Sequence, residues 1–206
     1  MKKNFFCNIF YLLIIFFLPL NNYAITEMTG EFIYTKTVYG ENRQNSIRYR
    51  RYGLVLVQYI FYVTGIELNY TQLSEVTTEN TTLDTGTSFL LSGLQNKSIT
   101  INQGIGLRQA LAPYGSLITP SISVGYAKQI KNSKTTYTIS DGYQTRQIEI
   151  YHGEIRNNAV FGTFSLKLQL TRLFGITGSV QTVFKAYEYN EAKNNITYTG
   201  GLGWIF

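Results

Sequence analysis

The sequence is poor in several residue types on which other classes of protein depend. Its 206 residues include one cysteine, three prolines and one histidine, and only 15% of them are charged. A soluble domain usually carries about 25% charged residues, so this chain has few groups that keep a surface in water. After residue 20, no stretch approaches the ~18 consecutive apolar residues of a membrane helix. This excludes a multi-span helical membrane protein.

The chain is instead rich in residues that favour strands. It contains 17 Tyr and 13 Phe, with abundant Thr and Ile, and such aromatic and β-branched residues are enriched in β-sheets. With few prolines and scattered glycines, extended disorder is not expected either. The composition predicts one all-β domain of ordinary size.

Residues 1–24 are predicted to be a secretory signal peptide. Lys2 and Lys3 form a positive start, Ile9–Leu20 an apolar stretch, and Asn22-Tyr23-Ala24 a cleavage site. The alternative is an uncleaved anchor, but this apolar stretch is shorter than a membrane span of about 20 residues. Cleavage leaves residues 25–206, which are 206 − 24 = 182 residues, as one domain and lowers the net charge from +6 to +4. Cys7 leaves with the signal, so no disulfide is expected.

Apolar and polar residues alternate with a period of two throughout residues 25–206, which indicates strands with two different faces. The clearest run places Phe164, Leu166 and Leu168 on one face and Ser165 and Lys167 on the other. The pattern predicts eight strands, at 29–39, 47–60, 65–77, 98–111, 117–130, 156–171, 175–189 and 196–206.

The connections between these strands alternate between short and long. Three are tight turns, at 61–64, 112–116 and 172–174, and the four others are generally longer and polar, at 40–46, 78–97, 131–155 and 190–195. Short turns on one side and long loops on the other are typical of outer-membrane barrels. The loop at 131–155 also contains Asp141-Gly142 between alternating runs, which is a hairpin signal. The sixth strand is therefore predicted to extend beyond the membrane as a β-ribbon.

The apolar faces of these strands meet either a protein core or hydrocarbon. A soluble sandwich or lipocalin-like cup would turn its other face to water, and such a surface normally carries more Lys and Glu than the small neutral residues found here. Aromatic residues also fall at both ends of the predicted strands, like the two interfacial girdles of membrane barrels. On the loop side these are Tyr34, Tyr39, Tyr49, Tyr70, Tyr126, Tyr187 and Tyr189, and on the turn side Tyr59, Tyr62, Tyr114, Phe174, Trp204 and Phe206.

The last strand closes on a terminal Phe, with Leu202, Trp204 and Phe206 at alternate positions. This ending resembles the signal by which bacterial outer-membrane barrels are recognised for assembly. The whole mature chain resembles the small barrels of the OmpA, OmpX and opacity-protein type. The resemblance implies an eight-stranded antiparallel up-and-down transmembrane β-barrel in a bacterial outer membrane, with both termini periplasmic. It also implies outer-membrane lipid and lipopolysaccharide as surroundings, the barrel-assembly machinery as a partner, and a monomer.

Five charged residues fall on the predicted inward face: Glu31, Glu67, Arg108, Lys167 and Lys185. The interior of an eight-stranded barrel is just wide enough for side chains to fill, and buried charges are unfavourable unless they are paired. We therefore expect a network of lumen charges that forms a salt-bridged plug. The alternative is a gated ion path, which requires the pairs to rearrange.

Arg48, Arg50 and Arg51 form the one local run of positive charge. Beside the outer interface they are candidates for contacts with lipopolysaccharide phosphates, because Arg binds phosphate bidentately. The alternative is that they are ordinary solvated charges beside the first loop.

His152 is the sole imidazole and lies next to Glu154 near a long loop. Enzymes on this scaffold include lipid A deacylases and palmitoyltransferases, but no Ser follows His152 two residues on, as the deacylase pattern requires. The sequence shows no metal cluster, phosphate loop or nucleotide motif. We therefore expect no catalytic residue, metal or cofactor, and no nucleic-acid partner.

The expected function is a structural or adhesive role at the cell surface. The loops at about 78–97 and 131–155 are the candidate contacts with a host or cell-surface partner. The first alternative is a narrow ion channel. A lipid A-modifying enzyme or a soluble secreted β-barrel comes after it.

Overall fold

The computed structural model describes residues 25–80, 83–84, 90–113, 115–141, 143–186, 192 and 195–206. The predicted signal peptide with Cys7 lies outside these residues, as do Tyr114, Tyr187 and Tyr189. The described residues form the strands β1 (Ile25–Tyr39), β2 (Asn45–Tyr59), β3 (Thr64–Glu79), β4 (Leu83–Asp84), β5 (Leu90–Ala110), β6 (Ile118–Ser140), β7 (Thr145–Gln169), β8 (Phe174–Lys185) and β9 (Ile196–Ile205). Within these residues, no helix has the length and apolar character needed to cross a membrane.

Eight of the strands close into a barrel. They pair antiparallel in the order β3-β2-β1-β9-β8-β7-β6-β5, and β3 pairs with β5 to complete the ring. The short β4 pairs only with the start of β5, at Leu90 and Leu91. The predicted eight-stranded antiparallel up-and-down barrel is confirmed.

The pairing register sets how far the strands lean. Directly paired residues can be traced around the barrel from Phe174 of β8 until the trace reaches β8 again at Phe184. The paired residues between them are Trp204, Met28, Leu56, Leu68, Ile105, Tyr126 and Val160. The line of paired residues is therefore displaced along β8 by 184 − 174 = 10 residues after one circuit of eight strands. Such a climb corresponds to a tilt of roughly 40° from the barrel axis, within the range of membrane barrels.

Alternation along each strand turns polar side chains into the lumen and apolar side chains outward. In β7, Thr163, Ser165 and Lys167 are buried, whereas Phe164 and Leu166 are exposed. This burial is inverted relative to a soluble protein, whose interior is mainly apolar. The outward apolar residues include Leu54, Ile105, Leu107, Ile122, Val124, Phe164, Leu166, Leu168, Ile176 and Leu202.

Apolar side chains also fill two levels of the lumen. Val55, Val57, Tyr59 and Ala110 form one buried cluster, and Ala127, Ala159 and Phe161 form another.

The Phe161 ring lies against glycines on two neighbouring strands. A Cβ added at Gly106 would lie 2.7 Å from Phe161 Cζ and 2.6 Å from the carbonyl oxygen of Val124. A Cβ added at Gly104 or Gly125 would meet the same ring. These glycines are needed because the ring occupies the space that their side chains would fill.

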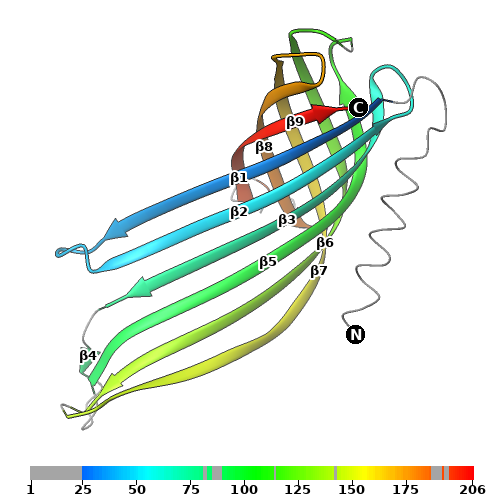
Figure 1. The fold of residues 1–206 in the computed structure, drawn as a ribbon. Helices are drawn as coiled ribbons and strands as arrows, with labels where there is room; N and C mark the ends of the chain where they lie inside the picture. Colours follow the sequence, from blue (N-terminus) through cyan, green and yellow to red (C-terminus); the bar gives the residue numbers. More distant parts are fainter. Residues whose placement is uncertain are drawn as a thin grey trace.

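Part of the sheet continues beyond the closed barrel as a curved, open sheet of six strands (Figure 1). The pairing of β7 with β8 ends at Ala159 and Lys185, and that of β1 with β9 ends at Phe32 and Gly200. In contrast, β1, β2, β3, β5, β6 and β7 remain paired with one another farther up. We call this part the extension; it comprises residues 33–39, 45–50, 74–79, 90–99, 132–140 and 145–158.

Two of the loops predicted from the sequence are largely strand. Residues 90–97 belong to β5, and most of 131–155 is divided between β6 and β7. The loop prediction is wrong at these positions because few side chains of the extension are buried on either face, and polarity alone does not distinguish such a strand from a loop. The predicted extension of the sixth strand as a ribbon is confirmed, since β7 stays paired with β6 as far as Thr145 and Ser140.

Candidate functional site

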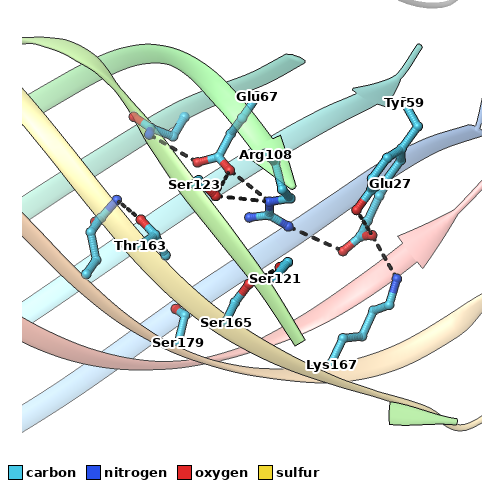
Figure 2. Close-up of polar contacts among 12 residues, drawn as sticks. Glu27, Tyr59, Glu67, Arg108, Ser121, Ser123, Thr163, Ser165, Lys167 and Ser179 are labelled. Carbon is cyan, nitrogen blue, oxygen red and sulfur yellow. Dashed lines mark hydrogen bonds and ion pairs between the residues drawn. The ribbon is translucent and has the colours of Figure 1, made fainter. Parts of the chain in front are cut away.

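The lower lumen holds a buried network of two carboxylates and two cations. Glu27 of β1 and Glu67 of β3 meet Arg108 of β5 and Lys167 of β7 inside the barrel (Figure 2). Arg108 Nε lies 2.8 Å from Glu67 Oε2, and Arg108 Nη1 lies 3.7 Å from Glu27 Oε1. Lys167 Nζ lies 2.8 Å from Glu27 Oε2. We call these four residues the lower network. Their formal charges cancel.

Hydroxyl groups complete the lower network. Ser123 Oγ donates to Glu67 Oε2 at 2.6 Å and accepts from Arg108 Nε at 3.3 Å. Tyr59 Oη donates to Glu27 Oε2 at 3.4 Å. Each carboxylate thus contacts both a cation and a hydroxyl donor, which is the condition under which buried ion pairs are tolerated.

A second network, the upper network, lies nearer the open end of the barrel. Arg51 Nη2 lies 3.6 Å from Glu31 Oε2, and Arg51 also donates to Gln181 of β8. Ser179 Oγ donates to Glu31 Oε1 at 2.9 Å, and Gln181 Nε2 donates to Thr163 Oγ1 at 3.2 Å. Arg51 and Glu31 are both buried, and their formal charges cancel.

Together, the two networks and the apolar clusters fill the lumen. Glu67 and Phe161 are each 1% exposed, and Val57 is 0% exposed. At the turn end, the space beside Tyr59 and Lys167 measures about 10 Å³, roughly that of one water molecule. An ion that crossed here would have to displace paired charges in a medium of low dielectric constant, which is unfavourable. Chemically, the arrangement is a plug.

Above the upper network, the lumen widens into a polar hollow of about 450 Å³. The charged residues on its wall are Arg51, Glu75, Lys131 and Lys185. Arg51 is already paired with Glu31, so the other charges on the wall are Lys131 and Lys185 against Glu75. This balance favours a polar or anionic molecule over an apolar one.

Four of the five charges expected in the lumen lie in these networks. Glu67, Arg108 and Lys167 belong to the lower network and Glu31 to the upper one. Lys185 does not: it is exposed on the wall of the hollow, because β8 ends at this residue. Its expected inward direction is confirmed, because it lines the hollow of the lumen, but the expected burial is not observed.

Sequence reasoning missed two lumen charges, Glu27 and Arg51. Glu27 precedes the predicted first strand by two residues, and it shares the alternation of Glu31. Starting that strand earlier would have placed Glu27 on the inward face. Arg51 was grouped with Arg48 and Arg50 as an outer-face cation. Its position alternates in step with Val55 and Val57, which face inward, and this would have indicated the lumen.

The arginine run is divided by strand β2. Successive residues of a strand point to opposite faces, so Arg51 lies in the lumen whereas Arg48 and Arg50 lie on the outer face. The expectation that Arg51 contacts lipopolysaccharide is wrong, because its guanidinium is buried against Glu31 and Gln181. On the outer face, Arg50 lies over the Tyr34 ring, 5.4 Å from its centroid.

Outward aromatic rings gather at two levels of the barrel. Because the ladder climbs 10/8 = 1.25 residues per strand, positions on different strands can be compared at equal height. The rings near the open end, which we call the upper girdle, lie within about two residues of one another in height: Phe32, Tyr34, Tyr52, Tyr70, Tyr126 and Tyr198. The lower group contains Phe174, Trp204 and Phe206, with Phe174 and Trp204 edge-to-face at 5.7 Å.

Two rings predicted at the interfaces face the lumen instead. Tyr49 lines the hollow, and Tyr59 contacts Glu27. Both lie on β2 at inward-facing positions, and distance from a strand end does not tell which face a ring occupies.

No protein-family model matches the chain, and no curated protein matches it. Among solved structures, it is similar to the N-terminal β-barrel domain of Pseudomonas aeruginosa OprF, at 13% identity over 88% of this chain and 97% of that chain, with a TM-score of 0.47. It is also similar to Ail, the attachment invasion locus protein of Yersinia pestis, at 12% identity over 89% and 98%, with a TM-score of 0.42. Acinetobacter baumannii CarO matches at 13% identity over 86% and 96%, with a TM-score of 0.38.

These neighbours are small outer-membrane barrels. Similarity at these identities and TM-scores does not indicate a shared function. What identifies the fold is the closed pairing of the strands. The chain is a small eight-stranded barrel.

The extension leaves two strand edges open. Among the described residues, no strand pairs with the outer edge of β7 before Ala159 or with that of β1 after Phe32. All residues of β7 from Thr145 to Arg156 are exposed.

One group of side-chain contacts links β6 and β7 across the ribbon that they form. Lys134 Nζ donates to Glu149 Oε1 at 2.5 Å and lies over the Tyr151 ring, 5.1 Å from its centroid. Tyr151 Oη donates to Glu149 Oε2 at 2.9 Å. The hydrogen bond from Lys134, followed by that from Tyr151, lowers the pKa of the Glu149 carboxyl, and the bond to Glu149 raises the pKa of Lys134.

The tip of the ribbon is held by Asp141. Its Oδ1 accepts hydrogen bonds from the backbone N–H groups of Gln144 at 2.6 Å and Tyr143 at 2.9 Å. These bonds, that of Gln144 first, lower the pKa of Asp141. The turn is therefore specified by an ionised carboxylate.

His152 lies on this exposed ribbon. Its Nε2 is 3.0 Å from Thr135 Oγ1, while Glu154, its near neighbour in sequence, contacts Arg156 instead. A catalytic imidazole needs a nucleophile and a group that orients it, and among the described residues no carboxylate contacts His152. Over the residues that the structure describes, no group of three metal-binding side chains occurs.

Proposed function

We propose that this chain is an integral protein of a bacterial outer membrane. The observation that carries the proposal is the inverted burial, with ion pairs inside and aliphatic side chains outside. The outward apolar band lies between the upper girdle and the lower aromatic group. These levels are roughly 20 Å apart along the barrel axis, comparable with the apolar band of about 25 Å in such barrels.

We propose that the barrel acts as a non-enzymatic surface protein with a structural or adhesive role. The plug stabilises the membrane part, and the extension projects from the outer surface. Open edges of β1 and β7 expose backbone groups that suit strand addition by a partner chain. Exposed Ile148, Ile150 and Tyr151 add side-chain contact area on the ribbon.

We also propose that the end of β9 is the signal for assembly. Leu202, Trp204 and Phe206 are all exposed on the outer face. Phe206 exchanges backbone hydrogen bonds with Thr26 at 2.9 and 3.2 Å, so the last residue belongs to the barrel wall. These exposed side chains at alternate positions suit recognition by the barrel-assembly machinery.

The test of location uses an epitope inserted after Asp141, at the tip of the ribbon, in the full chain expressed in a bacterial host. We expect the protein in the outer-membrane fraction, faster migration in unheated detergent gels, and antibody binding to intact cells. The matched control carries the epitope at Arg172, in a tight turn, and should bind antibody only after the cells are broken. Recovery in the soluble fraction, or equal labelling of both insertions, contradicts the proposal.

The test of the surface role removes the ribbon. Residues 134–151 are replaced by a short turn, and adhesion of the expressing cells to cultured host cells is measured. We expect adhesion to fall while heat-dependent gel migration persists. The control exchanges Thr136 and Thr138 for Ser, which changes the ribbon's outer face little. Undiminished adhesion after removal of the ribbon would show that the extension is not the contact surface.

A narrow channel is the second candidate, because the hollow of about 450 Å³ leads into the lumen. The packed networks beneath it oppose conduction.

A further inference from the structure

Three cations gather on the outer face of β1 and β2. Lys36 lies directly opposite Arg48 in the β1–β2 ladder, and Tyr34 lies opposite Arg50. Because alternate residues of a strand share a face, all three charged side chains point outward with Tyr34. We call Lys36, Arg48 and Arg50 the basic cluster.

Among the described residues, no acid lies at the outward positions beside the basic cluster. The neighbouring outward positions are Val38, Ser46, Gln72, Ser74 and Val76. Over the part of the chain that the structure describes, no carboxylate forms an ion pair with the three cations.

Two cations elsewhere on the outer face of the extension have acidic partners. Lys134 is paired with Glu149, and Arg156 is paired with Glu154. By contrast, the buried Nε of Arg48 has no hydrogen-bond partner among the described residues. Positive charge on β1 and β2 is thus left uncompensated, and the Arg48 guanidinium has an unused donor.

The basic cluster also lies at a particular level of the barrel. Corrected for the climb of 1.25 residues per strand, its residues lie roughly 5–10 Å above the upper girdle. Girdle rings sit at the level of lipid headgroups, so the cluster faces the phosphate layer of the outer leaflet. This step rests on the proposed membrane location.

We infer that the basic cluster is a binding site for the phosphate groups of a lipid A-type phosphoglycolipid in that leaflet. Each guanidinium can hold a phosphate by two parallel hydrogen bonds, and Lys36 adds a point charge. The Tyr34 ring, beneath Arg50, limits the positions that this guanidinium takes up. Below the cluster, Phe32, Tyr52 and Leu54 are exposed on the same face and offer an apolar surface to the acyl chains.

The test uses the full chain extracted from the membrane of the expressing host and native mass spectrometry with added lipid. Bisphosphorylated lipid A is compared with lipid A from which the phosphates have been removed, and inorganic pyrophosphate is added as a soluble competitor. We expect one tightly held bisphosphorylated lipid, much weaker binding of the dephosphorylated lipid, and no displacement by equimolar pyrophosphate.

The variant Lys36→Gln/Arg48→Gln/Arg50→Gln should bind bisphosphorylated lipid A at least about tenfold more weakly, because it loses several charge-assisted hydrogen bonds. The matched control, Lys97→Gln/Lys134→Gln/Arg156→Gln, removes the same charge from higher on the outer face and should stay within about twofold of the parent. The single change Arg50→Lys keeps the charge but loses the planar fork, and it should weaken binding severalfold.

Three results would overturn the inference. They are unchanged binding by the cluster variant, an equal loss in the control variant, and equal affinity for the dephosphorylated lipid. Displacement by equimolar pyrophosphate would assign the site to soluble phosphate instead. Heat-dependent gel migration is measured for every variant. A barrel that folds but does not prefer phosphorylated lipid contradicts this inference alone. A chain that stays soluble contradicts the membrane location. If the triple variant does not fold, the Arg50→Lys variant decides.

Discussion

Arg108 and Glu67 form a buried ion pair, with 2.8 Å between Nε and Oε2, although 41 residues separate them in the chain. They project from the neighbouring strands β5 and β3 into the same level of the lumen. Arg108 also reaches Glu27 on β1, so one guanidinium connects three strands of the wall.

Loss of the Arg108 charge should strongly destabilise the barrel. Arg108→Met leaves Glu67 with hydroxyl and amide neighbours but no cation, and breaking a buried pair in this way typically costs about 3–5 kcal/mol. We expect the urea midpoint of unfolding in detergent to fall, as followed by the loss of heat-dependent gel migration. The double variant Arg108→Met/Glu67→Gln removes the unpaired charge and should recover part of the loss. No recovery in the double variant would show that packing, not charge, sets the effect.

Gly106 is expected to tolerate no side chain. In Gly106→Ala, the new Cβ would meet both Phe161 and the backbone of Val124, and overpacking of this kind costs about 1–3 kcal/mol. Gly178→Ala is the control, because a Cβ there has nothing within 4 Å. Thermal unfolding in detergent should shift downward for Gly106→Ala and hardly change for Gly178→Ala. An equal shift of the unfolding temperature in the two variants would contradict the contact between Gly106 and Phe161.

The ribbon should loosen in acid. The pKa of Glu149 is lowered in the folded chain, chiefly by its hydrogen bond from Lys134. This stabilisation is therefore present above the unfolded carboxyl pKa of about 4.3 and is lost as the pH falls through the lower folded pKa. Amide exchange, corrected for intrinsic rates, should show lower protection of residues 133–151 at pH 3 than at pH 6.

Asp141 acts in the same direction, because its pKa is lowered as well. The variant Glu149→Gln/Asp141→Asn should therefore show ribbon protection that hardly changes between the two pH values. If its acid sensitivity equals that of the parent, other groups control the ribbon.

The plug predicts electrical silence. With Glu67, Arg108 and Phe161 packed across the lumen, the purified barrel should show no steady conductance in planar bilayers over a range of voltages. Lys128→Gln, on the outer wall, should be equally silent. Steady single-channel steps from the parent protein would favour the channel and contradict the plug.

The Phe206 side chain should matter for assembly more than for stability. In Phe206→Ala the backbone bonds with Thr26 remain possible, so refolding of the purified chain into detergent should be little changed. In living cells, we expect less folded protein in the outer membrane and more unassembled chain. Leu170→Ala removes another exposed outward side chain near the same level and serves as the control. An equal fall in folded outer-membrane protein for both variants would mean that the lost lipid contact, not recognition of Phe206, explains the result.

Local sequence pattern was sufficient for the strands and for the class of fold. The alternation of Phe164, Ser165, Leu166 and Lys167 is a property of neighbouring residues, and a period of two turns them to opposite faces wherever the strand lies. The small neutral residues of one face also indicated which side lies in the lumen. Four lumen charges were found in this way, because each follows the alternation of its own strand.

The partners of those charges were decided only in the closed barrel. That Arg108 meets Glu67 and Glu27, and that Arg51 meets Glu31, depends on the register between strands and on the climb of the ladder around the ring. Neither quantity is encoded within a single strand. The same holds for the extension: whether polar residues such as those of 132–140 form a strand or a loop depends on a paired neighbour, since a wetted strand has no buried face to mark it. The residues of each strand thus specify the strand itself. Which strands meet, and at what height, depends on the closed barrel, because hydrogen-bond register is a relation between segments distant along the chain.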